Sequence, residues 1–130
     1  MIDPEHALAS WFMLISSAVF LVGYALPLLF VPMTWARWFR WEVPEKTHLA
    51  IYLGRCLGAV ALSIIVVVVR GAGDPRGHRV LFDLIALVTG LMTLVHTWGA
   101  IRRIQPWTEH VEIGLYALVT GLALWIGSGL

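Results

Sequence analysis

Four long apolar runs dominate the sequence and set what the chain can fold into. They cover about residues 7–31, 49–69, 80–101 and 108–128. A helix needs about 20 residues to cross roughly 30 Å of hydrocarbon, and each run reaches that length. Because lipid offers no partner for backbone polar groups, a spanning run must be a helix. The sequence therefore predicts an all-α integral membrane protein whose first partner is the lipid bilayer.

The composition agrees with this prediction. Hydrophobic residues make up 59% of the 130 residues and charged residues only 13%, against about 25% charged residues in an average soluble domain. At this composition a small soluble domain would have too few polar residues to cover its surface. A single cysteine excludes an intrachain disulfide, and a formal charge of +1 gives no basic surface for nucleic acid.

The connections between the runs are short, which makes neighbouring helices antiparallel. We predict one transmembrane domain, residues 1–130, folded as a four-helix bundle with up-down-up-down order. The first and third loops then share one side, which carries five Lys and Arg residues, while both termini and the second loop share the other, which carries three. The positive-inside rule predicts that loops one and three are cytoplasmic and that the termini lie opposite. We expect this membrane to be a bacterial inner membrane.

The first loop contains an amphipathic segment at about residues 34–42. Trp35, Trp38 and Trp41 recur every three residues, with Arg37 and Arg40 between them. Indole rings favour the headgroup layer, where arginines face anionic lipid. The segment is therefore interpreted as an interfacial belt, or alternatively as a docking surface for a partner subunit or a ligand lid.

A few polar residues interrupt the apolar runs. Arg55 lies about six residues, or roughly 9 Å, inside the second run, where a charge normally faces the bundle interior unless it snorkels to the interface. Counting residues from the helix ends places a set of polar side chains in one membrane layer. These are Tyr24, Tyr52, Arg55, His96, Glu112 and Tyr116. We predict that this layer is a candidate ligand-binding site.

Helical phase groups these residues further. Glu112, Tyr116 and Thr120 share one helix face, and Thr89, Thr93 and His96 share another. If the faces meet, Arg55 and Glu112 neutralise each other within a polar pocket for a quinone headgroup, a sterol-like hydroxyl or a proton-coupled substrate. The alternative is a buried ion pair that only fixes helix register.

Cofactor and catalytic signals are weaker. Only His96 among the five histidines lies well inside an apolar run, and no two histidines are four residues apart. This spacing does not favour haem or a metal, so we assign no metal ligand. A quinone is the cofactor that these features still allow. No nucleophile elbow, phosphate loop or zinc motif is present, which favours a role other than catalysis.

Gly54 and Gly58 flank Arg55 in a small-xxx-small pattern that favours close helix approach, so both are candidate interface residues. The stretch from Tyr52 to Gly58, with its Arg-x-x-Gly signature, resembles DoxX-like membrane proteins. The resemblance implies a small four-helix membrane protein, and some members are associated with quinone-linked redox systems. The signature is also similar to the four-helix scaffold of ergosterol biosynthesis. Only Arg55 and Gly58 map to the shared pattern.

Three functions are compatible with these features. The leading hypothesis is a non-catalytic accessory or scaffold subunit of a larger membrane complex, partnered by other membrane subunits or by its own copies. The first alternative is a redox component that interacts with a quinone or another lipophilic ligand. The second is a small oligomeric proton-coupled transporter, with Asp83 or Glu112 as the coupling carboxylate.

Overall fold

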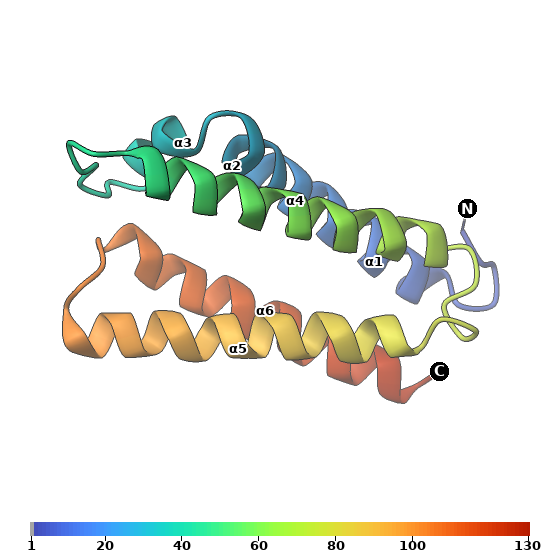
Figure 1. Ribbon diagram of the computed structural model, residues 1–130. Coiled ribbons are helices and arrows are strands. Elements are labelled where there is room, and N and C mark those ends of the chain that lie inside the picture. Colours follow the sequence, from blue (N-terminus) through green and yellow to red (C-terminus); the bar gives the residue numbers. More distant parts are fainter. Residues whose placement is uncertain (1) are drawn as a thin grey trace. The chain divides into compact units, whose positions relative to one another are not determined.

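The computed structural model describes residues 2–130, and within that range every regular element is a helix (Figure 1). The elements are α1 (Ala7–Phe20), the π-helix η1 (Leu21–Ala25), α2 (Leu26–Phe30), α3 (Pro32–Trp38), α4 (His48–Gly71), α5 (Val80–Arg102) and α6 (Thr108–Ser128). Four stretches are long and apolar enough to cross a membrane: Ala7–Phe30, His48–Gly71, Val80–Arg102 and Thr108–Ser128. The predicted all-α class and the four predicted spans are confirmed, and the chain is a small four-span membrane protein.

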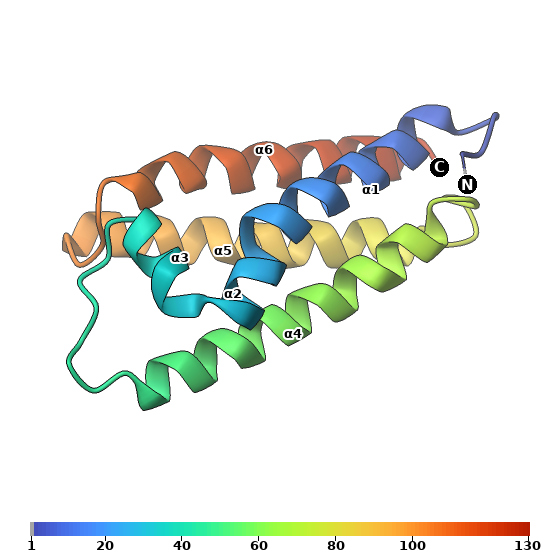
Figure 2. The same cartoon turned by 90° about the horizontal axis from the view of Figure 1, so that it is seen from above.

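The described residues form two compact units. Unit 1 contains residues 2–12 and 71–130, and unit 2 contains residues 13–70. In unit 1, α5 and α6 run side by side as an antiparallel hairpin in both views (Figures 1 and 2). Phe82 is fully buried there, and a Cβ at Gly127 would lie only 2.9 Å from its Cβ. The glycine thus lets α6 approach α5 closely.

The start of the chain also belongs to unit 1. Ser10 is fully buried, and its hydroxyl donates a hydrogen bond of 2.6 Å to the carbonyl of Ala72. The rings of Phe12 and Phe82 stack with centroids 5.9 Å apart. These contacts fix the first turns of α1 against the polar turn that precedes α5.

The turn after α5 is closed by a Schellman motif. The Arg103 amide donates to the Ala100 carbonyl, and the Ile104 amide donates to the Gly99 carbonyl. Arg103 adopts the left-handed conformation, with φ of 53°, that such a motif requires and that glycine usually supplies. This turn aims the chain directly into α6.

The first span in unit 2 is not a straight helix. Pro27 lies in α2 and has no amide hydrogen, so it cannot donate to the Gly23 carbonyl four residues before it, as an α-helical residue would. The chain then reverses at Val31, and α3 folds back beside α2 (Figure 2). Trp35 on α3 donates its indole N–H to the Gly23 carbonyl at 2.8 Å. A side chain therefore donates to a carbonyl to which Pro27 cannot donate.

Helix α4 packs against this bent segment through its two glycines. A Cβ at Gly58 would lie 2.6 Å from the Leu29 amide nitrogen and 2.9 Å from the Ala25 carbonyl oxygen, and one at Gly54 would lie 2.7 Å from Pro32 Cβ. Gly54 and Gly58 thus let the backbone of α4 approach this segment closely within the chain itself.

The pairing of Trp35 with the carbonyl left by Pro27 is testable by a double-mutant cycle. We expect Trp35→Phe to lower the free energy of unfolding by about 1 kcal/mol beyond the loss of indole packing, because a carbonyl in apolar surroundings loses its donor. In a Pro27→Ala background the backbone amide returns, and the cost of Trp35→Phe should fall by about that amount. Unfolding in mixed detergent micelles measures both costs, and equal costs in the two backgrounds would contradict the assignment.

Candidate polar site between α5 and α6

Polar side chains line the inner face of the α5/α6 hairpin. Near its middle, the hydroxyl oxygens of Thr89 and Thr120 lie 2.7 Å apart. Each also lies 2.8 Å from a carbonyl one turn back on its own helix, at Ile85 and Tyr116. Since a hydroxyl has one hydrogen, one threonine donates across the interface and the other to its own helix. The contact fixes the register of the two helices.

The main polar feature is a buried cluster of one histidine and two glutamates, which we call the His–Glu cluster: His96, Glu109 and Glu112. His96 Nε2 lies 3.0 Å from Glu109 Oε2 and 3.3 Å from Glu112 Oε2. His96 is 7% exposed and each glutamate 4%. The Tyr116 ring covers the imidazole, with centroids 5.1 Å apart. The cluster thus joins α5 to α6 out of contact with solvent.

The tautomer of His96 follows from its second nitrogen. Nδ1 lies 2.8 Å from the Met92 carbonyl oxygen, one turn back on α5. A carbonyl can only accept, so Nδ1 carries a hydrogen. Nε2 then presents to the two carboxylates either a second hydrogen, on an imidazolium, or an electron pair. In both cases the two carboxylate oxygens face the same ring nitrogen.

Local sequence explains why the glutamates gather here. Glu109 and Glu112 are three residues apart at the start of α6, so both project from one side of the helix. The first turns of a helix carry partial positive charge, which stabilises carboxylates. In the preceding turn, Gln105 donates from Nε2 to the His96 carbonyl at 2.9 Å. A Cβ at Gly99 would collide with Gln105 Oε1, so this glycine makes room for the contact.

The structure unites half of the predicted polar layer. His96, Glu112 and Tyr116 come together, and the two predicted threonine-bearing faces meet. The other three residues belong to unit 2. Tyr24 lies in an aromatic group with Trp35 and Phe39, at centroid distances of 6.0 and 6.2 Å.

The remaining two members of the layer lie on α4. Tyr52 and Arg55 are exposed there. The pairing of Arg55 with Glu112, and a ligand pocket that uses all six residues, stay predictions. Glu112 is paired with His96 in the structure.

Glu109 is the site residue that sequence reasoning missed. Depth counting along the last helix selected Glu112 and Tyr116, and Glu109, one residue into the helix, was not considered. The signal was present in the spacing, because Glu109 and Glu112 are three residues apart and share a face with Tyr116.

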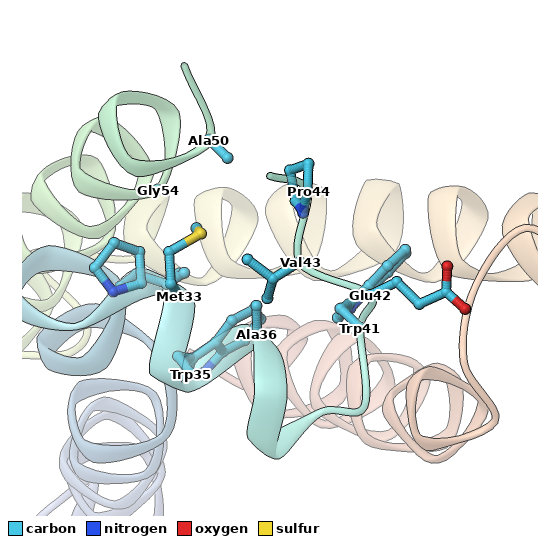
Figure 3. A pocket seen from close by; sticks show the side chains of 11 residues that line it. Met33, Trp35, Ala36, Trp41, Glu42, Val43, Pro44, Ala50 and Gly54 are labelled. Carbon is cyan, nitrogen blue, oxygen red and sulfur yellow. The ribbon is translucent and has the colours of Figure 1, made fainter. Parts of the chain in front are cut away.

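The predicted interfacial segment divides its tryptophans between two roles. Trp35 faces the bent first span, whereas Trp38 on the same helix is 63% exposed. Arg37 is exposed, and Arg40, two residues past the end of α3, adopts the left-handed conformation with φ of 62°. Trp41 contributes to an open groove of about 320 Å³ within unit 2 (Figure 3). The groove is lined by Leu28, Pro32, Met33, Trp35, Ala36, Trp41, Glu42, Val43, Pro44, Ala50 and Gly54.

Comparisons with known proteins find no relative. No family model matches the chain. No curated protein and no solved structure is significantly similar to it.

The energetic weight of the His–Glu cluster can be measured directly. We expect His96→Leu to lower the free energy of unfolding by about 3–5 kcal/mol, because it removes the imidazole that lies between two buried carboxylates. Thr89→Val, which removes one neutral hydrogen bond, should cost about 1 kcal/mol. The triple change of His96, Glu109 and Glu112 to Leu should recover most of the loss. Denaturant titration in micelles measures these losses of unfolding free energy. A loss for His96→Leu no larger than that for Thr89→Val would contradict the expectation.

Proposed function

We propose that this protein is a non-catalytic accessory or scaffold subunit of a larger membrane assembly. The observation that carries the proposal is a face of small exposed residues on α6, formed by Gly114, Ala117 and Gly121. A Cβ added at Gly114 or Gly121 meets no described atom within 4 Å. Residues at these spacings share one side of a helix. Small residues let a second helix approach closely in lipid, where van der Waals packing drives association.

The inner face of the same hairpin supports this role. Its polar side chains are used to join α5 and α6 through Thr89, Thr120 and the His–Glu cluster. Such cross-links fix helix register. A hairpin held in this way presents its outer face in a constant geometry, which is what a scaffold needs. We further propose the orientation predicted from the loop charges, with loops one and three in the cytoplasm.

The subunit proposal is tested by native purification followed by mass spectrometry of co-purifying proteins. We expect the wild-type chain to be recovered in a complex, and Gly114→Leu/Gly121→Leu to reduce recovery at least about tenfold, since the larger side chains block close approach. The matched control is Ala59→Leu, at an exposed small residue of α4. Helix content by circular dichroism should stay unchanged in both variants. A wild-type chain isolated as a stable monomer would refute the proposal.

A second candidate, binding of a quinone or another lipophilic ligand, is favoured by the groove in unit 2. Its lining is almost entirely apolar, with Glu42 as the charged member. Its volume of about 320 Å³ is at the lower end of the range for small-molecule sites. Gly54 in this lining precedes Arg55, and the Arg-x-x-Gly resemblance to DoxX-like proteins points to the same ligand class.

The ligand proposal is tested with a short-chain quinone analogue added to the purified protein in micelles. Ala50→Phe fills the groove, and Arg55→Leu removes the arginine of the Arg-x-x-Gly signature. We expect each change to weaken binding at least about tenfold, which corresponds to about 1.4 kcal/mol. Ala59→Phe serves as the control for added bulk on α4. Unchanged affinity in Ala50→Phe and Arg55→Leu would exclude this site.

A further inference from the structure

We infer that His96, Glu109 and Glu112 form a binding site for a divalent first-row transition-metal ion. Histidine spacing alone does not favour a metal, because it counts only imidazoles. The structure adds two carboxylates to the one buried imidazole. The three side chains come from two helices and offer one nitrogen and two oxygen donors, all within 4.8 Å of one another. This inference is independent of the proposed partner-binding face, which lies on α6 at Gly114, Ala117 and Gly121.

The spacing of the donor atoms fits a coordination shell. Zinc lies about 2.1 Å from nitrogen and oxygen ligands, so adjacent ligands of a tetrahedral ion are roughly 3.4 Å apart. His96 Nε2 lies 3.0 Å from Glu109 Oε2 and 3.3 Å from Glu112 Oε2. An ion could therefore be seated among them with small side-chain shifts. Three protein ligands leave a fourth position for a water molecule or another donor.

His96 is already oriented as a metal ligand. Its Nδ1–H donates to the Met92 carbonyl at 2.8 Å. A metal-bound histidine usually donates its other ring N–H to a carbonyl or carboxylate, which fixes the tautomer and leaves the second nitrogen to the ion. In the tautomer without a hydrogen on Nε2, the electron pair of Nε2 is directed toward the two glutamates, as a metal ligand requires.

Charge and donor chemistry favour a divalent ion of intermediate softness. A divalent cation matches the combined charge of the two carboxylates, and the three residues of the cluster are at most 7% exposed. Charged groups at such low exposure favour an ion of opposite charge beside them. One imidazole with two carboxylates suits zinc, manganese or ferrous iron, while Ca²⁺ requires six or more oxygen ligands.

The test uses the full chain in detergent micelles, stripped with EDTA and titrated with Co²⁺ and then Zn²⁺. We expect one ion per chain, visible as Co²⁺ ligand-field bands that Zn²⁺ abolishes. Glu109→Gln and Glu112→Gln, which keep the side-chain shape, should each weaken Zn²⁺ binding at least about 100-fold, because loss of a ligand exceeds the effect of a lost outer-shell partner. Glu42→Gln and His110→Asn alter exposed groups and should bind as the wild type does.

Two results would overturn the inference. The first is wild-type protein that binds neither ion at micromolar concentration. The second is Zn²⁺ binding unchanged in Glu109→Gln and Glu112→Gln, which would mark an adventitious surface ion. If a glutamine variant does not fold, the thermal midpoint of the wild type decides the question. We expect stoichiometric Zn²⁺, but not Mg²⁺, to raise it, and no rise would reject the site.

Discussion

Every polar group inside an apolar helix must find its partner within the protein, and this constraint explains the local geometry of the chain. The Gly23 carbonyl, deprived of its donor by Pro27, is satisfied by the Trp35 indole. Threonines in α5 donate to carbonyls one turn back, as Thr93 and Thr97 do at 2.9 and 2.7 Å. Local contacts of this kind leave few polar groups able to act between helices.

The His–Glu cluster is the principal exception, because it joins two helices through ionisable groups. Buried ionic groups often add little net stability over apolar residues, but they disfavour any register that leaves them unpaired. In this chain the cluster aligns α5 with α6, and the Thr89–Thr120 contact fixes the same register nearer the middle of the hairpin. The hairpin consequently has a polar inner face that holds it together and an outer face of α6 with small residues. Our proposals place cation binding on the first face and partner binding on the second.

The fold was predictable in its main elements, because a spanning helix is specified by length and hydrophobicity alone. The sequence also predicted which residues of α5 and α6 share a face, since a period of 3.6 residues orders them. It did not predict the π-helix or the turning of Trp35 toward Gly23, which depend on a contact across twelve residues. Glu109 was missed because depth along one helix says nothing about the imidazole opposite. Arg55 could not be placed for a similar reason. Its depth in the second run was predictable, but no sequence pattern specifies the direction of its side chain, which is exposed on α4.

The most direct test is solid-state NMR of the protein in lipid bilayers, labelled with ¹⁵N-histidine and ¹³C-glutamate. The His96 signals can be identified by their loss in His96→Asn. We expect a protonated Nδ1, together with dipolar couplings from Nε2 to the carboxyl carbons of both Glu109 and Glu112. A proton-free Nδ1, or an Nε2 without coupling to either carboxyl carbon, would contradict the cluster and the inferences drawn from it.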